Sequence, residues 1–291
     1  MAHRSRPLKR LLGRLWPIAP LRPVLLAALH VFWLLKFAKH HRRLPLQPSR
    51  RFNDFLFSIK AGREITHPLR AQVTDKVHGK AFIADRLGPN FTPKTLAVLT
   101  RAPDLVSYLP PYYPVMAKPT HSSGRFVKIS SAEEYVAQIP VMQGWLAHDY
   151  FLTSLERHYD GLEKKIIIEA FIEDSFWLEG SVHCRHGDPR IISLIDRYTK
   201  HRQSFRADRT PLGVSLGYPF QELQVKDWRF FDGLLAQCRT LSEPFSYMRV
   251  DFYTDGHSLV FGELTSLPAG ANGRFYPDGG EAIFSKAFFG P

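Results

Sequence analysis

Two acidic residues inside a predicted β-hairpin restrict the fold of this chain more than any other feature. In residues 247–265, "YMRVDFYTDGHSLVFGELT", two alternating apolar runs flank an Asp-Gly pair that is typical of hairpin turns. Asp251 lies in the first run and Glu263 in the second, although strands are normally poor in such acids. Arg249 precedes Asp251 by two residues, so these two side chains share one face of the strand.

The turn decides whether the two acids meet. A three-residue turn, 255–257, would pair Asp251 with Phe261 and leave Glu263 diagonally opposite on the same face, about 7–8 Å away. A two-residue turn would put the acids on opposite faces. On one face they could hold Mg²⁺ or Mn²⁺, since oxygen ligands favour these ions over zinc. Magnesium completes its shell with water and substrate phosphates, which Arg249 would contact. The open alternative is an ordinary salt bridge between Arg249 and one acid.

The net charge of +12 is confined to an N-terminal arm, residues 1–51. This arm holds 12 of the 39 lysines and arginines and none of the 27 acidic residues. The remaining chain is neutral and lacks the basic surface of a nucleic-acid-binding domain, so we expect no nucleic-acid partner.

The two cysteines are too few for a disulfide framework or a structural zinc site, and they indicate buried thiols in a reducing compartment.

The arm is also apolar, and its charge-free run covers residues 23–35. That run is shorter than the roughly 20 residues of a membrane span. We expect an interfacial helix, with residues 1–43 contacting the cytoplasmic face of the cell membrane peripherally through apolar side chains and basic flanks. Two alternatives stay open at this point: a helix packed on the protein's own body, and a true span.

The rest of the chain has the pattern of an α+β protein, since antiparallel hairpins dominate its second half. Apolar spacing predicts a helix over 75–87, closed by Gly88, and further helical structure over 141–164. The predicted strands cover 95–100, 115–119, 164–173 and two segments within 179–197, and another helix covers 225–241.

Two lysines occupy positions where a bound anion would account for a positive charge. Lys118 lies in an apolar strand and is followed by a small polar loop, 121–124, whose backbone could approach a phosphate closely. Lys76 begins a helix, where a cation opposes the helix dipole. Each lysine could equally be an ordinary solvated side chain.

Glu169 ends a strand that is predicted to be buried on both faces. The backbone after it could form a slot for an adenine base, and Glu173 or Glu179 could contact ribose hydroxyls. A strand end that simply reaches solvent is the alternative.

Downstream, a basic cluster could bind an anionic acceptor or an acyl-phosphate, with His201 handling protons. The cluster consists of Asp196, Arg197, Lys200, His201, Arg202 and Arg206.

The order of these features resembles an ATP-grasp nucleotide site, and more narrowly the TupA-like ATP-grasp family of bacterial surface-polysaccharide genes. The most specific matching stretches are "RVDFY" and "GELT". Others are "RFNDFLFSIK", "TDKVHGKAFIADRLG", "VMAKPTHSSG", "IIIEAFIED", "DRYTKHRQSF", "LGYP" and "RFYPDGG", which together run from Phe52 to the C-terminus in family order.

The resemblance implies two α+β subdomains around ATP, preceded by the arm, with divisions at 1–51, 52–114 and 115–291. It implies an ATP- and Mg²⁺-dependent ligase that joins a carboxylate to an amine through an acyl-phosphate, on glycan or amino-acid substrates of a surface polysaccharide. An ATP-grasp kinase, a sugar transferase and a non-catalytic assembly factor are alternatives from other classes.

The resemblance also implies roles for individual residues. The metal ligands would be Asp251 and Glu263, and the catalytic residues would be Arg249, Lys118 and His201. The nucleotide-binding residues would be Lys76, Lys118, His121, Ser122, Ser123, Gly124, Glu169, Ala170, Phe171, Ile172 and Glu179.

Three positions depart from the usual ATP-grasp pattern. The loop "HSSG" has one glycine where the family tends to have two. Ser181 stands where relatives often carry a lysine, and Thr265 stands where most other ATP-grasp enzymes have a metal-binding asparagine. A threonine is usual at this last position in the TupA-like group.

Overall fold

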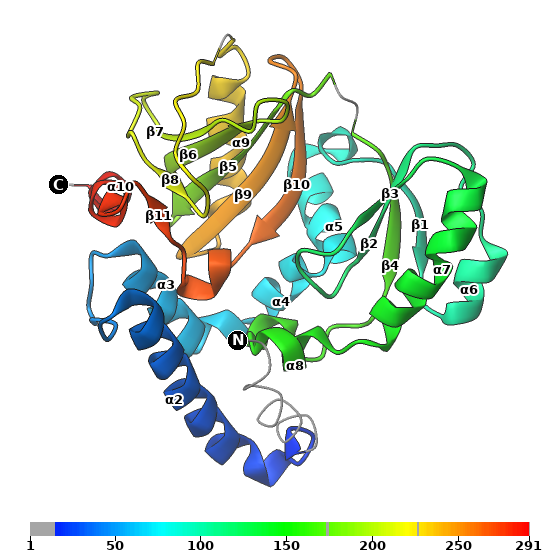
Figure 1. Ribbon diagram of the computed structural model, residues 1–291, viewed down its shortest axis with the longest axis horizontal. Coiled ribbons are helices and arrows are strands. Elements are labelled where there is room, and N and C mark those ends of the chain that lie inside the picture. The colour runs from blue at the N-terminus through cyan, green and yellow to red at the C-terminus, as the bar shows by residue number, and fades with distance from the viewer. Residues whose placement is uncertain (1–14, 173–174, 226, 291) are drawn as a thin grey trace.

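The protein contains two antiparallel sheets, one in each half of the view in Figure 1. The computed structural model describes residues 15–172, 175–225 and 227–290. Four strands form the first sheet in the order β1-β4-β2-β3: β1 (Thr95–Leu99), β4 (Ile166–Ala170), β2 (Val115–Pro119) and β3 (Val127–Ile129). Helices α6 (Ala102–Ser107) and α7 (Ala132–Ala147) pack beside it.

The second sheet has five strands in the order β10-β9-β5-β6-β7. These strands are β5 (Leu178–Arg185), β6 (Asp188–Asp196), β7 (Arg202–Arg206), β9 (Tyr247–Thr254) and β10 (Leu259–Thr265). Helix α9 (Phe231–Ser242) covers one face. Two short strands, β8 (Ser215–Leu216) and β11 (Phe275–Tyr276), pair beside the sheet.

The remaining α-helices join the two sheets and carry the termini of the described chain. They are α2 (Arg22–His41), α3 (Phe52–Ala61), α4 (Pro68–Thr74), α5 (Lys76–Leu87), α8 (Tyr150–Ser154) and α10 (Gly280–Phe289). Phe82 and Ile83 of α5 belong to the apolar core of the five-stranded sheet, while the N-terminal end of α5 hydrogen-bonds the end of β2 through Lys76 N and Thr120 O, 3.3 Å apart. Helix α5 therefore bridges the two sheets.

The structure confirms the α+β class and most predicted elements. The helix over 75–87 and the strand over 115–119 are present almost to the residue. The expectation of continued helix over 141–164 is wrong: α7 ends at Ala147, and the short α8 stops where Leu155 adopts a left-handed conformation (φ 58°). The division at 114 and 115 stays a prediction, and β1 pairs with β4 across it.

The hairpin has a different register from the expected one. Its turn has four residues, 255–258, so Thr254 pairs with Leu259. A β-bulge at Gly262 then shifts the register and places Glu263 directly opposite Asp251. Because directly paired residues of an antiparallel ladder point to the same face, the two acids do share a face. The predicted pairing of Asp251 with Phe261 is therefore wrong, because the turn is one residue longer than expected and the bulge adds one more residue to β10.

Helix α2 packs along the body through one face and leaves the opposite face exposed (Figure 1). Leu29, Trp33 and Phe37 are almost fully buried in a core that also contains α3 and α8. Burial of a large apolar side chain contributes about 1.5–3 kcal/mol, so this contact is a substantial part of the fold. The segment Ala19–His41 is also long and apolar enough to cross a membrane, by length and composition alone.

Candidate active site

Asp251 and Glu263 meet at the side chain of Thr265. The Thr265 hydroxyl donates to Glu263 Oε1 over 3.2 Å and lies 3.5 Å from Asp251 Oδ2. Arg249 donates two hydrogen bonds to Asp251, from Nε at 2.7 Å and Nη2 at 2.5 Å, and a third to Thr265 Oγ1 at 3.1 Å. The salt bridge weighed as an alternative is thus present, but it forms one side of a polar cluster with a second acid next to it.

The electrostatics of this acid pair favour a cation. Burial raises the pKa of Asp251 to about 6; Arg249 opposes this rise, while Glu263 and Glu179 add to it. Burial alone would lower the pKa of Arg249, but the charge of Asp251 raises it. Two carboxylates and one hydroxyl form an oxygen-only donor set, which fits Mg²⁺ or Mn²⁺. Within the described chain, no group of three or more His, Cys, Asp or Glu side chains could hold a metal.

Glu169 lies between two lysines at the end of β4. Its Oε2 is 2.7 Å from Lys118 Nζ on β2, and its Oε1 is 2.7 Å from Lys80 Nζ on α5. Glu169 is only 4% exposed, and its paired cations lower its pKa although burial acts to raise it. Burial also lowers the pKa of Lys80, against the raising effect of Glu169. The carboxylate therefore fixes two ammonium groups beside each other.

Lys76 begins α5 as predicted, and its side chain turns toward both sheets. Asp75 caps the helix by accepting hydrogen bonds from Val77 N and His78 N. Lys76 Nζ donates to the Ser122 carbonyl over 2.5 Å. Burial lowers the pKa of Lys76; Glu263 opposes that shift and Lys118 adds to it. Lys76 thus lies within electrostatic reach of the hairpin acid and of the first-sheet lysine.

The loop 121–124 is held at its start and open at its end. His121 is buried and its Nε2 donates to the Trp145 carbonyl over 3.2 Å. His121 Nδ1 and the buried Ser122 Oγ have no hydrogen-bond partner among the described residues. Ser123 and Gly124 are exposed, and Gly124 has φ +70°. This is the conformation in which glycine avoids strain, so the single glycine of the loop sits where one is needed.

The predicted adenine slot follows β4. The Ala170 N–H donates to the Lys94 carbonyl over 2.8 Å. Phe171 is half-buried, and the centre of its ring lies 4.1 Å from Lys128 Nζ. Ile172 is half-buried as well. The Glu169 side chain pairs with lysines, so its own contribution is to position cations. Glu173, the alternative ribose ligand, lies outside the described residues.

A cavity of about 390 Å³ opens on the five-stranded sheet beside the acid pair. Its wall combines Arg249 and Asp251 with a hydroxyl-rich surface and one arginine stacked on an aromatic ring. The Arg202 guanidinium lies 3.6 Å from the centre of the Tyr218 ring. The polar side chains that line the cavity are Glu179, Ser181, His183, Ser193, Arg202, Gln203, Ser204, Ser215, Tyr218, Arg249, Asp251 and Tyr253.

The structure separates the members of the predicted basic cluster. Arg202 lines the cavity, whereas His201 lies half-buried in the turn before β7 and is not among the described lining residues. The His201 backbone N–H bonds Thr199 Oγ1 at 3.2 Å, and its carbonyl accepts from Asp196 N at 2.9 Å. A proton-transfer role for His201 stays a prediction.

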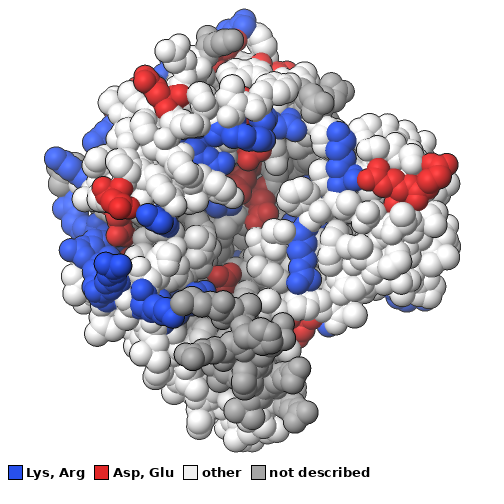
Figure 2. All heavy atoms as spheres, viewed as in Figure 1, with Lys and Arg blue, Asp and Glu red and all other residues white. Residues whose placement is uncertain are grey.

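The sequence interpretation missed three parts of this site. Lys80 follows Lys76 by one helical turn, so its position on the same face was available as a signal. Tyr218 and Ser215 reach the cavity through the β8–β11 pairing, which joins residues 59 and 61 positions apart and has no local signal. In Figure 2, acidic side chains lie in the central hollow and basic side chains flank it.

The sequence matches the family model "TupA-like ATPgrasp" over residues 58–288. No curated protein matches the chain. Among solved structures, the chain is similar to the ATP complex of D-alanine–D-alanine ligase from Bacillus anthracis, with 15% identity and a TM-score of 0.44 over 67% of this chain and 56% of that one. It thus spans little more than half of that ligase.

Two further solved structures show the same level of likeness. D-cycloserine synthetase DcsG has 15% identity and a TM-score of 0.44, covering 80% of this chain and 77% of that chain. The ATP-grasp ligase PsnB with its minimal precursor has 11% identity and a TM-score of 0.39, covering 70% and 55%.

Proposed function

The chain belongs to the TupA-like ATP-grasp family, with the ATP-grasp fold, and from this premise we propose that it is a ligase that joins a carboxylate to an amine. ATP phosphorylates the carboxylate, and the amine then attacks the acyl-phosphate and releases phosphate. The proposed substrates are glycan or amino-acid units of a bacterial surface polysaccharide.

One observation carries the proposal. A group of lysines with excess positive charge lies within electrostatic reach of a pair of acids with excess negative charge. Lys80 and Lys118 share the carboxylate of Glu169, and Lys76 lies near them with Glu263, Glu169 and Asp75 as acidic neighbours, whereas Asp251 and Glu263 share Arg249. A magnesium–triphosphate complex has the complementary pattern, with anionic phosphates for the lysines and a cation for the acids.

Each group then has a role in positioning or charge neutralisation. Lys76 and Lys118 hold the nucleotide phosphates, and the residues His121, Ser122, Ser123 and Gly124 cover them. The adenine lies against Ala170, Phe171 and Ile172, and Glu179 faces the ribose. Asp251 and Glu263 hold Mg²⁺, or Mn²⁺ with the same donor chemistry, and the ion would neutralise the phosphoryl charge. Arg249 stabilises the group in transfer, and no covalent protein nucleophile is required.

The cavity beside Asp251 supports a polar carboxylate as substrate. Serine hydroxyls from β5, β6, β7 and β8 line it, and Ser193 Oγ and Ser204 Oγ are 2.9 Å apart. These groups can exchange hydrogen bonds with sugar hydroxyls, and Arg202 can pair with a carboxylate. The opening of the cavity toward Arg249 and Asp251 would present that carboxylate to the phosphoryl group.

The cellular part of the proposal is a cytoplasmic enzyme held peripherally at the inner face of the membrane through residues 1–43. The apolar helix Ala19–His41 with its basic flanks supports this contact. A membrane position also suits an enzyme of surface-polysaccharide assembly.

The test is ADP release by the purified full chain with a panel of uronic acids, amino acids and amines. Ligation requires that ADP and phosphate form only when carboxylate and amine are both present. Hydroxylamine in place of the amine should trap the acyl-phosphate as a hydroxamate. A phosphorylated glycan would instead make the protein a kinase, and absence of Mg-ATP binding would make it a non-catalytic assembly factor.

A further inference from the structure

We propose that α2 lies in the plane of an anionic membrane surface as a rigid part of the catalytic body. One face of the helix belongs to the protein core and the opposite face enters the lipid. This inference rests on the proposed membrane contact and adds to it the contacting face, the orientation of the helix and the way it is attached.

The outward face of α2 is an apolar stripe. Val24, Ala28, Val31 and Leu35 recur at steps of four, three and four residues, which places them on one side of an α-helix. Val24 is 68% exposed, Val31 is 55% exposed and Leu35 is 65% exposed. At 1.5 Å per residue the stripe is about 16 Å long. Leu21 and Ile18 extend it as exposed residues toward the N-terminus.

The charges around the stripe match an anionic lipid surface. Arg22, Lys36, Lys39 and Arg42 are exposed along and beside the helix, and no acidic residue occurs before Asp54 in the sequence. Apolar side chains flanked along the chain only by basic ones are the pattern of a helix seated in the interface between headgroups and acyl chains. We therefore commit to a bilayer with anionic headgroups as the partner.

The inward face fixes the helix to the body. Trp33 donates from Nε1 to the Leu155 carbonyl over 3.2 Å, and the rings of Phe37 and Phe57 pack edge to face with centroids 5.2 Å apart. Leu25 and Leu29 are buried on the same side. The buried and exposed residues lie on opposite sides of α2, so both faces can be occupied at once.

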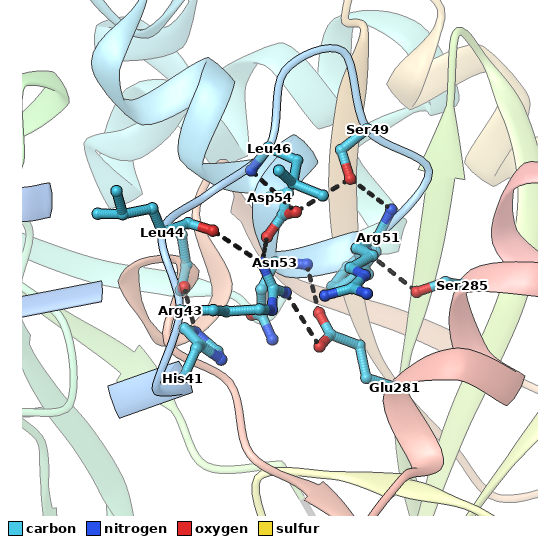
Figure 3. Close-up of polar contacts among 12 residues, drawn as sticks. His41, Arg43, Leu44, Leu46, Ser49, Arg51, Asn53, Asp54, Glu281 and Ser285 are labelled. Atoms are coloured by element: carbon cyan, nitrogen blue, oxygen red, sulfur yellow. Dashed lines mark hydrogen bonds and ion pairs between the residues drawn. The ribbon is translucent and has the colours of Figure 1, made fainter. Parts of the chain in front are cut away.

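The linker after α2 is locked as well (Figure 3). Asp54 is fully buried and accepts hydrogen bonds from Arg43 Nη1 at 2.5 Å, Leu46 N at 3.2 Å and Ser49 Oγ at 3.0 Å. Glu281 on α10 accepts from Asn53 N at 3.0 Å. These bonds hold the linker against α3 and α10, so the arm and the catalytic body move together.

This attachment argues against both a span and a loose tether. A span would carry α2 through about 30 Å of hydrocarbon, and the polar groups fixed beside it, such as Asp54 and Glu281, would have to follow. A tether would require Trp33 and Phe37 to leave the core. When the helix lies in the membrane plane, its inward face stays packed on the core while its outward face enters the lipid. The active site then keeps a fixed orientation to the membrane.

The test compares vesicle binding of the full chain and of two double variants. Vesicles contain phosphatidylcholine with or without 30% phosphatidylglycerol, and sedimentation gives the partition coefficient. V31E/L35E should lower binding to the anionic vesicles about tenfold or more, because it removes apolar depth and adds acids at the surface. V136E/V141E, which changes two exposed valines of α7, should bind like the wild type.

The outcomes separate this inference from the proposed contact. If the wild type does not bind anionic vesicles, the membrane contact itself is wrong. If the wild type binds and V31E/L35E binds equally well, the contact stands and the assigned face is wrong. Equal thermal melting of both variants ensures that the loss comes from the surface, and a V31S/L35S pair with the same loss would support the stripe if the acidic pair folds poorly.

Amide hydrogen exchange tests the attachment. With vesicles bound, exchange over residues 25–37 and 52–61 should stay as slow as in the free protein, since the core contact persists. Faster exchange in these segments on vesicle binding would show that α2 leaves the body and would overturn the rigid arrangement.

Discussion

The lysine group (Lys76, Lys80 and Lys118 with Glu169) carries a net positive charge. The acid pair on the second sheet (Asp251 and Glu263 with Arg249) carries a net negative charge. Around Glu169, two lysines share one carboxylate and Lys76 lies nearby, so positive charge is in excess. On the hairpin, two acids share Arg249, and Glu179 adds to their repulsion. Each group is only partly neutralised by its own partner. The metal–nucleotide complex proposed as the ligand carries both charges and would complete both groups.

The two groups also differ in how they are held. Glu169 fixes its lysines from inside the first sheet with almost no solvent exposure. The acids depend on a bulge and on one hydroxyl, because Gly262 sets the register and Thr265 joins Glu263 to Asp251. The lysine group is therefore rigidly held, whereas small structural changes can alter how Asp251 and Glu263 lie relative to each other.

Loss of a hairpin acid should have the largest effect. We expect D251N or E263Q to lower kcat for ADP formation about a thousandfold, because the transferred phosphoryl group loses its metal. Melting temperature should not fall for E263Q, since removing Glu263 relieves its repulsion with Asp251. A variant with near-normal kcat would break the assignment of the acids.

Loss of a first-sheet lysine should act mainly on binding. K118M should weaken ATP affinity about a hundredfold, because a charge-assisted contact to phosphate is removed and Glu169 keeps only Lys80 as partner. Isothermal titration calorimetry measures this directly. The matched control is K286M, an exposed lysine on α10, which should bind ATP normally.

Alkaline pH should weaken the cationic group and leave the ionised acids unchanged. Burial lowers the pKa of Lys76, so its positive charge is lost at a lower pH than that of an ordinary lysine as pH rises. ATP affinity should consequently fall roughly threefold between pH 8 and pH 9.5. K76R keeps its charge in this range and should flatten the profile. An identical decline in K76R would remove Lys76 from the phosphate site.

The smallest expected effect concerns the hydroxyl between the acids. T265V keeps the shape of the side chain but loses the hydrogen bond to Glu263, so half-saturation by Mg²⁺ should rise about twofold. T265N restores a polar ligand of the kind found in most other ATP-grasp enzymes and should recover the wild-type requirement. A Mg²⁺ titration of ADP formation distinguishes the two variants, and no change in T265V would make the threonine dispensable.

Local patterns predicted much of the fold and the types of residue in the site. The periodicity of 75–87 placed Lys76 at a helix start, and the alternation of 247–265 placed Asp251 in a strand, as the structure confirms. The predicted register was wrong because the turn has four residues and a bulge adds one more, although the glycine at 262 inside a strand was a usable signal for the bulge.

Long-range packing was beyond local patterns. The cavity depends on β8 pairing with β11 and on Arg202 stacking over Tyr218, which no spacing in the sequence encodes. Helix α2 has apolar residues on both faces, so its sequence could not show which face packs on the body. The contacts of Trp33 and Phe37 show that one face packs on the body, and membrane contact of the other face stays a prediction.

The central claim is that the lysine group and the acid pair bind one metal–nucleotide complex. The most direct test is the ATP dissociation constant by calorimetry with 5 mM (about physiological) Mg²⁺ and with EDTA, for the wild type and for a D251N/E263Q double variant. The account predicts that EDTA weakens ATP binding at least about tenfold in the wild type and has no effect in the double variant. Equal affinity with and without Mg²⁺ in the wild type, or persistent Mg²⁺ dependence in the double variant, would contradict it.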